Sequence, residues 1–223
     1  MQLTFLRSEP EASNVKTFHF QKPEGFTYTA GQYQTWKLSP EGEPNDDQAH
    51  WFTISAPPSA DTLTISTRVT DSAFKQKLNS LQAGDKITAE KVEGDFIWED
   101  DQEVVLIAGG IGVTPYHSIL LERDHGGKKL NATLVYGNRD DQVVFRDEFD
   151  ELQTRHPELK VVYLIGEKLT AESLLKAAPE IRDRLTYLSG PEPMVDAIGD
   201  DLKAHGVTNL KQDWFPGYNE SNY

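Results

Sequence analysis

The chain has 223 residues, a net charge of −14 and no cysteine. Without cysteine it contains no disulfide, no thiolate nucleophile and no cysteine-held iron–sulfur cluster. The acidic balance disfavours nucleic-acid binding and docking on anionic membranes. The six histidines are scattered, with no HxH or HxxxH pair, so no metal site is predicted.

No stretch approaches the roughly 20 apolar residues that a membrane-spanning helix needs. The first residues, "MQLTFLRSEPEAS", show neither the basic flank nor the apolar block of a signal peptide. We therefore expect a cytoplasmic protein without membrane insertion, and a monomer. The length suits one large domain or two domains of ordinary size.

Short alternating runs fill the first hundred residues and are separated by turn-rich segments. These runs predict strands over 16–21, 32–38, 50–55, 62–69 and 85–92. Phe74, Leu78 and Leu81 recur at helical spacing, which predicts a helix over 72–81 with Ser72 as its N-cap. Closely spaced strands of this kind predict an antiparallel β-barrel.

The rhythm changes after residues 97–103, "IWEDDQE", where we place a domain boundary. Strands that end in glycine are predicted over 104–109, 131–137, 160–166 and 184–190. Helices are predicted over 114–126, 144–157, 170–183 and 191–206. Strands that alternate with helices imply a parallel sheet covered on both faces. The predicted fold is a β-barrel domain, residues 1–98, followed by a doubly wound α/β domain, residues 99–223.

The segment "VVLIAGGIGVTP" ends a buried strand in glycines and then opens a helix. Ligands of open parallel sheets bind beyond the carboxyl ends of the strands, where helix N-termini favour anions. At Gly109, Gly110 and Gly112 the missing Cβ atoms would let a pyrophosphate approach the main chain. Thr114 adds a hydroxyl, and Pro115 fits the first helical turn. The alternative is a tight strand–helix turn without a ligand.

Two later strands end in the same way. "YLSGPEPMV" places Gly190 and Pro191 before a helix near Met194, and "LVYGNRDD" ends in Gly137, Asn138 and Arg139. The second of these positions is where doubly wound folds hold a nucleotide ribose or its 2′-phosphate. Several such strand ends on one sheet favour a dinucleotide.

Six motifs in sequence resemble those of the ferredoxin–NADP reductase superfamily, particularly its oxygenase-reductase-like members. "AGQY" is similar to a P-G-Q-Y strand start, and "HWFTIS" to the flavin motif R-x-Y-[ST]. "TDSAFKQKLNSLQAGDKI" is similar to the flavin-phosphate segment, and "EGDF" to a G-P-x-G-x-F turn. "GGIGVTP" resembles the nicotinamide-nucleotide loop, and "SGPEPMV" resembles C-G-P-x-x-M. The match covers about nine-tenths of the chain.

The resemblance implies an FAD-binding barrel. Phe52 would lie against the isoalloxazine ring, Thr53 would offer its hydroxyl to N5, and Ser72 would bind the pyrophosphate. Otherwise Phe52 is an ordinary core residue and Ser72 only an N-cap. The residues that the resemblance assigns to flavin are His50, Phe52, Thr53, Ile54, Ser55, Thr67, Arg68, Val69, Asp71, Ser72 and Ala73. His50 replaces the usual arginine, which makes FMN the alternative to FAD.

The resemblance also implies NADH or NADPH as the hydride donor. The residues assigned to this nucleotide are Gly110, Gly112, Val113, Thr114, Pro115, Gly137, Asn138, Arg139, Gly190, Pro191, Met194 and Phe215. Those assigned to hydride transfer are Thr53, Ser189, Asp213 and Phe215. Ser189 stands where many members have cysteine. We favour Phe215 over the terminal Tyr223 as the stacking aromatic, and we expect Trp214 to serve in packing.

The predicted activity is transfer of a hydride from NAD(P)H to FAD, followed by electron transfer to a separate acceptor. That acceptor is a ferredoxin, a flavodoxin, an oxygenase component or a small molecule. The alternatives are a reductase that releases free reduced flavin, an electron-transfer subunit of a larger complex, and a non-catalytic nucleotide sensor. Asp140 and Asp141 beside Arg139 favour NADH over NADPH, whereas Arg139 with Arg146 would favour the reverse.

Overall fold

A computed structural model describes residues 1–38, 49–98 and 100–215. The chain divides into two compact units. Unit 1 comprises Met1–Trp98 and His117–Glu122, and unit 2 comprises Glu99–Tyr116 and Arg123–Tyr223. The segment 117–122 lies within the predicted α/β domain by sequence but groups with unit 1.

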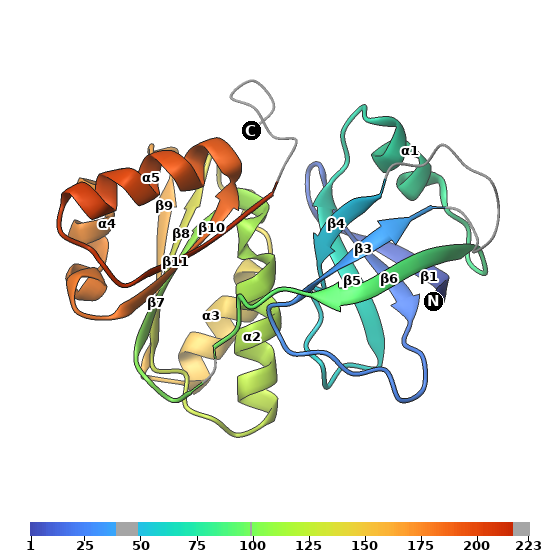
Figure 1. Ribbon diagram of the computed structural model, residues 1–223, viewed down its shortest axis with the longest axis horizontal. Coiled ribbons are helices and arrows are strands. Elements are labelled where there is room, and N and C mark those ends of the chain that lie inside the picture. The colour runs from blue at the N-terminus through green and yellow to red at the C-terminus, as the bar shows by residue number, and fades with distance from the viewer. Residues whose placement is uncertain (39–48, 99, 216–223) are drawn as a thin grey trace. The chain divides into compact units, whose positions relative to one another are not determined.

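Unit 1 contains an antiparallel sheet of six strands in the order β4-β3-β6-β1-β2-β5 (Figure 1). Its elements are β1 (Gln2–Ala12), β2 (Val15–Gln21), β3 (Tyr33–Lys37), β4 (His50–Thr53), β5 (Thr62–Arg68), α1 (Ala73–Ser80) and β6 (Lys86–Glu93). Each predicted strand of this half is present, and the predicted barrel topology is confirmed. The sequence did not predict β1.

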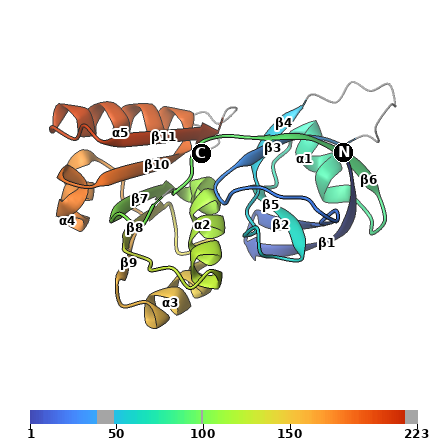
Figure 2. The same ribbon diagram turned by 60° about the horizontal axis from the view of Figure 1, so that its bottom comes forward.

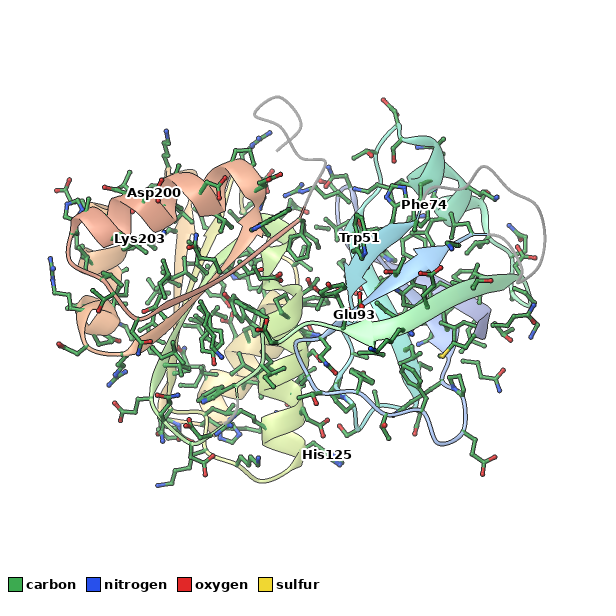
Figure 3. The ribbon with its side chains drawn as sticks, viewed as in Figure 1. Trp51, Phe74, Glu93, His125, Asp200 and Lys203 are labelled. Carbon is green, nitrogen blue, oxygen red and sulfur yellow. The ribbon has the colours of Figure 1, made fainter. Side chains whose placement is uncertain are left out.

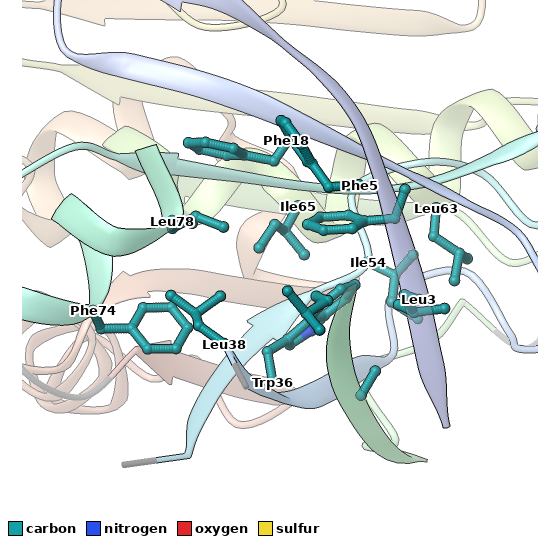
Figure 4. Packing of buried hydrophobic residues seen from close by; sticks show 13 residues of the cluster. Leu3, Phe5, Phe18, Trp36, Leu38, Ile54, Leu63, Ile65, Phe74 and Leu78 are labelled. Atoms are coloured by element: carbon teal, nitrogen blue, oxygen red, sulfur yellow. The ribbon is translucent and has the colours of Figure 1, made fainter. Parts of the chain in front are cut away.

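The interior of unit 1 follows from alternation along its strands. Leu63 and Ile65 of β5 point into the core, where they meet Phe18, Phe20 and Trp36 (Figure 4). Helix α1 contributes Phe74 and Leu78, which lie on one helical face as their spacing predicts. Large aromatic side chains therefore fill the interior of the barrel. A ligand of unit 1 has to bind outside this core.

The alternate residues of β5 carry hydroxyl groups that satisfy one another. The Ser66 hydroxyl lies 2.7 Å from that of Thr17 and 2.9 Å from that of Ser55. The Ser55 hydroxyl also lies 2.8 Å from that of Thr64. All four residues are buried, and a buried hydroxyl without a partner would be costly. This network fixes the chain that follows β4.

Unit 2 contains a parallel sheet of five strands in the order β11-β10-β7-β8-β9. Its elements are β7 (Val104–Gly109), η1 (Gly110–Val113), α2 (Thr114–His125), β8 (Ala132–Asn138), α3 (Arg146–Arg155), β9 (Leu159–Ile165), α4 (Ala171–Ala177), η2 (Pro179–Arg182), β10 (Leu185–Pro191), α5 (Glu192–Ala204) and β11 (Leu210–Phe215). Helices α2 and α3 cover one face and α4 and α5 the other (Figure 2). The predicted doubly wound fold is confirmed.

The order of the strands in unit 2 reverses beside β7. The chain proceeds from β7 to β8 and β9, then crosses to the other side of β7 to form β10 and β11. In such sheets ligands bind at this switch point, outside the carboxyl ends of the two central strands. Here those ends are Gly109 of β7 and Pro191 of β10. The topology thus selects two of the three glycine-rich strand ends.

Among the described residues, no helix is long and apolar enough to cross a membrane.

Candidate functional site

The two central strand ends of unit 2 pack directly on each other. A Cβ placed on Gly112 would stand 2.4 Å from the carbonyl oxygen of Ser189 and 2.6 Å from Cα of Gly190. A Cβ on Gly109 would stand 2.1 Å from Sδ of Met194. Gly112 is thus required by main-chain contact between the two strand ends, and not only by the approach of a ligand, as the sequence had suggested, whereas the Met194 side chain facing Gly109 is flexible. Gly110 is needed for another reason, its φ of +53°.

Helix α2 does not begin directly at the end of β7. One turn of 3₁₀ helix, η1, separates β7 from α2. The Thr114 hydroxyl donates to the carbonyl oxygen of Ile111 at 3.2 Å, so its proton is already used within the loop. The loop can offer a ligand two kinds of group. These are the lone pairs of the Thr114 hydroxyl, as acceptors, and the first main-chain N–H groups of α2, as donors. Pro115 lies in the first turn of α2 as predicted, and Val113 is fully buried.

Ser189 occupies the centre of the switch point. Its residue is fully buried, and its hydroxyl has no hydrogen-bond partner among the described residues. An unpartnered buried hydroxyl is costly, so its presence calls for an explanation such as a ligand or a water molecule. Register pairs Ser189 with Ala108 on β7 and with Asp213 on β11. The structure therefore places two of the residues predicted for hydride transfer on neighbouring strands.

Strand β11 brings the C-terminal residues to the same sheet edge. Phe215 pairs in register with Pro191, at the start of α5. Asp213 lies near the buried Tyr116, whose hydroxyl donates to the carbonyl oxygen of Ile107 at 3.0 Å. Burial raises the pKa of Tyr116 well above its ordinary value, and the charge of Asp213 raises it further. Tyr116 therefore remains a neutral donor beneath this edge.

The prediction that Trp214 serves in packing is wrong. Its side chain is 46% exposed, on the face of β11 opposite to Asp213 and Phe215. Because β11 is an edge strand, alternation alone did not ensure that both of its faces are covered. The other aromatic that the sequence offered, Tyr223, lies outside the described residues.

The third glycine-rich strand end, that of β8, carries a tight polar loop. The Asn138 side-chain amide donates to the carbonyl oxygens of Asp140 at 2.9 Å and Gln142 at 3.1 Å. The Asp140 carboxylate accepts from the main-chain N–H of Gln142 at 3.0 Å. Arg139 is exposed beside them. The loop is therefore held by Asn138 and Asp140, while Arg139 points to solvent.

Arg146 is less available than the sequence suggested. Its guanidinium lies 4.6 Å from the centre of the Tyr163 ring, and its Nε lies 3.8 Å from an Asp150 carboxylate oxygen. A Cβ on Gly137 would meet the Leu169 side chain at 2.6 Å, a contact that rotation of this side chain can relieve. Of the two arginines near this strand end, only Arg139 has no such engagement in the described part of the chain.

In unit 1 the residues predicted to contact flavin gather around α1. The ring of Phe74, in its first turn, lies 4.0 Å from the His50 ring and 5.7 Å from the Phe52 ring, measured between centroids. Phe74 was predicted only as a core residue of the helix. Its contact with His50 and Phe52 was not predicted, because residue pairs that the fold brings together leave no local pattern in the sequence.

The start of α1 is exposed and polar. Ser72 is the N-cap as predicted, and its hydroxyl accepts from the Lys75 main-chain N–H at 3.4 Å. No acidic residue lies in the first turn, so the helix N-terminus keeps its positive potential. Asp71 and Ala73 are exposed on either side of Ser72. A phosphate group fits this end of the helix.

Arg68 stands at the end of β5, shortly before α1. Its guanidinium donates to the side-chain oxygen of Asn14 at 3.1 Å, an interaction across 54 residues that the sequence did not indicate. The neighbouring Thr67 is buried, and its hydroxyl lies 3.5 Å from the Arg68 carbonyl oxygen. Val69 packs on the barrel core. Arg68 thus lies four residues before Ser72 in the chain, with its guanidinium bonded to Asn14.

Three other predicted flavin contacts have buried side chains. Ile54 is part of the barrel core, and Ser55 uses its hydroxyl in the buried network. Their main-chain N–H groups also have partners, because they donate to the carbonyl oxygens of Gln32 and Thr64. Thr53 is 4% exposed and pairs with Tyr33. In contrast, Trp51 between His50 and Phe52 is 52% exposed (Figure 3). Within residues 1–38, 49–98 and 100–215 no cluster of metal-ligating side chains occurs.

Residues 106–200 match the family model of the oxidoreductase NAD-binding domain. The ferredoxin reductase component of the 3-ketosteroid-9-alpha-monooxygenase of Mycolicibacterium smegmatis is 28% identical over 88% of this chain and 60% of its own length. The flavohem-like FAD/NAD-binding domain of nitric oxide dioxygenase from Vibrio cholerae superposes with a TM-score of 0.80 at 24% identity, covering 96% of this chain and 98% of its own.

A ferredoxin NADP+ reductase from Neisseria gonorrhoeae superposes with a TM-score of 0.81 at 17% identity, covering 96% of this chain and 97% of its own. The chain therefore has the fold of these two structures. It spans 52–60% of the length of the first curated relatives that it matches.

Proposed function

We propose that the chain is a member of the ferredoxin–NADP reductase superfamily and an NAD(P)H-dependent flavoprotein reductase that passes electrons to a separate acceptor. One observation carries the proposal. The buried, unpartnered hydroxyl of Ser189 lies at the switch point of a nucleotide-binding sheet, in register with Asp213. A bound FAD would supply the redox chemistry, namely uptake of a hydride and release of electrons to the acceptor.

The residues of the chain bind and orient in this proposal. The loop Gly110–Pro115 and the start of α5 receive the nucleotide, and Ser189 offers its hydroxyl at the transfer site. Phe52 lies against the flavin ring, and Thr53 provides a hydroxyl beside it. Arg68 and the N-terminus of α1 hold the flavin phosphates. FAD is favoured because the exposed helix end suits a pyrophosphate.

An anaerobic reduction experiment tests the proposal. The purified protein, loaded with FAD, is mixed with NADH or NADPH, and bleaching of the flavin absorption band is followed. We expect bleaching within a single turnover and FAD in the mass spectrum of the released cofactor. A protein that binds neither FAD nor FMN, or a flavin that stays oxidised, overturns the proposal.

We propose NADH as the preferred donor. Asp140 and Asp141 follow Arg139 in the loop after β8, and Asp147 and Glu148 lie in the first turn of α3. Arg146 is engaged by Tyr163 and Asp150. This excess of negative charge disfavours a 2′-phosphate. A tenfold higher kcat/KM for NADPH, equivalent to about 1.4 kcal/mol, would overturn the preference. Arg139→Ala should lower only the NADPH value if Arg139 binds the phosphate.

A second candidate is a reductase that releases free reduced flavin. It is favoured by the position of His50, whose ring lies on Phe74, in place of an arginine that would pair with a phosphate. Fewer charged contacts predict weaker flavin retention. Gel filtration of the loaded protein separates the two candidates, because flavin that elutes with the protein supports electron transfer to a separate acceptor.

The acceptor is proposed to be an oxygenase component, a ferredoxin, a flavodoxin or a small molecule. The relative from Mycolicibacterium smegmatis is the ferredoxin reductase component of a monooxygenase, which supports the first of these. Stopped-flow reoxidation of the reduced protein by each class of acceptor ranks them.

A further inference from the structure

One side chain fastens the edge strand β11 to helix α5. The amide Nε2 of Gln212 donates to the main-chain carbonyl oxygen of Val195 at 3.2 Å. Val195 precedes Gly199 by four residues, so the two lie one above the other on the same helical face. A Cβ placed on Gly199 would stand 2.3 Å from that same Nε2. The missing side chain of Gly199 therefore lets the amide reach the helix.

The backbone gives no other reason for a glycine at this position. Gly199 lies inside α5 and does not have a positive φ. In a helix interior, glycine is less favourable than alanine because it loses more conformational freedom. The sequence thus carries a helix-weakening residue at the point where Gln212 needs room.

The position of this contact matters because β11 has only one neighbouring strand. It pairs with β10 alone, at the edge of the sheet. The ends of such strands fray easily, since only one ladder of hydrogen bonds holds them. Gln212 directly precedes Asp213 and lies three residues before Phe215, which is the last described residue. A second attachment here restrains the segment that carries both.

We propose that Gln212 and Gly199 form a latch that positions Asp213 and Phe215 for hydride transfer. Both are positioning residues, because they act through β11 and not by touching a ligand. The effect on hydride transfer rests on the proposed function. The latch itself does not, because its residues lie within unit 2. It also links β11 to α5, the helix that directly follows β10. The strand that carries Ser189 and the strand that carries Asp213 and Phe215 are therefore both attached to α5.

Three variants test the latch directly: Gly199→Ala, Gln212→Ala and the double variant. Hydrogen–deuterium exchange of the peptide covering 210–215 is measured by mass spectrometry. We expect faster exchange in each single variant and no further increase in the double variant, because both substitutions remove the same contact. Gly199→Ala should also leave the thermal midpoint unchanged or raise it, since alanine strengthens α5.

The consequence for the site is measured with the flavin-loaded protein. The single-turnover rate of flavin reduction should fall about two- to tenfold in each variant, the range that one lost hydrogen bond allows. The dissociation constant for ADP-ribose, which lacks the nicotinamide ring, should stay unchanged. A variant that was merely unstable would not combine an intact thermal midpoint, intact ADP-ribose binding and a slower reduction.

Asp200→Ala is the matched control. It changes the residue next to Gly199, whose side chain is 82% exposed on the outer side of α5 (Figure 3), and it likewise favours the helix. We expect wild-type exchange over 210–215 and a wild-type rate. Unchanged exchange in Gly199→Ala and Gln212→Ala overturns the latch. Faster exchange with a wild-type rate overturns its positioning role. A wild-type protein that does not reduce flavin instead overturns the proposed function.

Discussion

The two candidate sites are built from different parts of the chain. In unit 2 the site is mainly main chain: Gly112 lies against Ser189 and Gly190, and the strand ends set what a ligand meets. In unit 1 it is mainly side chains, in which Phe74 of α1 meets His50 and Phe52 of β4. A site made of main chain depends on contiguous residues and on missing side chains. A site made of side chains depends on pairs that the fold brings together.

This difference determines how each site should respond to substitution. Main-chain packing between two loops has no flexible partner that can move aside, so one added methyl group strains the fold. A cluster of side chains can adjust its rotamers, so a substitution there should weaken binding more than it weakens folding.

The largest expected effect is that of Gly112→Ala. Its Cβ would meet main-chain atoms of Ser189 and Gly190 at 2.4–2.6 Å, which only a shift of the loop can relieve. We expect a loss of about 3 kcal/mol in the free energy of unfolding, together with loss of nucleotide binding. Urea denaturation and a nucleotide titration measure the two.

Gly137→Ala is the control for that substitution. Its Cβ would meet the Leu169 side chain, which can rotate away, so about 1 kcal/mol is expected. Equal losses at Gly112 and Gly137 would show that main-chain contact between the loops is not what makes unit 2 sensitive.

The same division between main-chain and side-chain sites explains which features could be predicted from the sequence. The glycine-terminated strands of unit 2 and the Ser72 cap were predicted because each depends on neighbouring residues. The pairs Arg68 with Asn14 and His50 with Phe74 were not, since nothing local in the sequence distinguishes an arginine that will meet an asparagine 54 residues away.

Strand β1 was missed for a related reason. Only Leu3 and Phe5 of its eleven residues belong to the barrel core, and Pro10 within it argues against a strand. The pairing shifts register between Pro10 and Ala12, where the proline's missing N–H is accommodated. Partner strands on both sides stabilise what its own composition does not favour. For Trp214 the strand was predicted but the exposure of the side chain was not. An alternating pattern does not reveal which face of an edge strand remains uncovered.

Phe74→Leu tests the side-chain site of unit 1. Leucine keeps most of the buried volume, so the free energy of unfolding should fall by only about 1 kcal/mol. The ring contacts with His50 and Phe52 are lost, which should raise the flavin dissociation constant about two- to tenfold. Fluorescence titration with FAD measures it. Leu78→Met, in the same helix and core, should leave the flavin dissociation constant unchanged. A large loss of stability with unchanged flavin affinity would assign Phe74 to the core alone.

Ser189→Ala separates the chemistry of unit 2 from its packing. The hydroxyl is buried and unpartnered among the described residues, so its removal should raise the free energy of unfolding by about 1 kcal/mol. The rate of flavin reduction should fall about three- to tenfold if the hydroxyl acts at the transfer site. Thermal denaturation and single-turnover kinetics measure the two. A variant that is more stable and equally fast would remove Ser189 from the transfer site.

The smallest expected effect lies at the other edge of the unit 2 sheet, where α2 and α3 end. There the Asp124 carboxylate accepts from Arg155 at 2.8 Å and lies 2.7 Å from the His156 ring. Burial alone would raise the pKa of Asp124, but the hydrogen bonds from Arg155 and His156 outweigh it and hold the pKa below the ordinary 3.8. A lowered pKa means that the charged carboxylate stabilises the fold above that value, and that this stabilisation is lost as the pH falls through the folded-state pKa.

Asp124→Asn should therefore lower the thermal midpoint at pH 7 by about 2–4 °C. The difference from wild type should stay constant down to about pH 5 and shrink below the ordinary value of 3.8, where the wild-type carboxylate also becomes neutral. Calorimetry from pH 7 to pH 3 measures it. Nucleotide binding should be unchanged, because this cluster lies at the amino ends of the strands and the candidate site at their carboxyl ends. A difference that does not depend on pH would mean that Asp124 acts by shape alone, and a loss of nucleotide binding would mean that stability at one edge of the sheet is coupled to the site at the other.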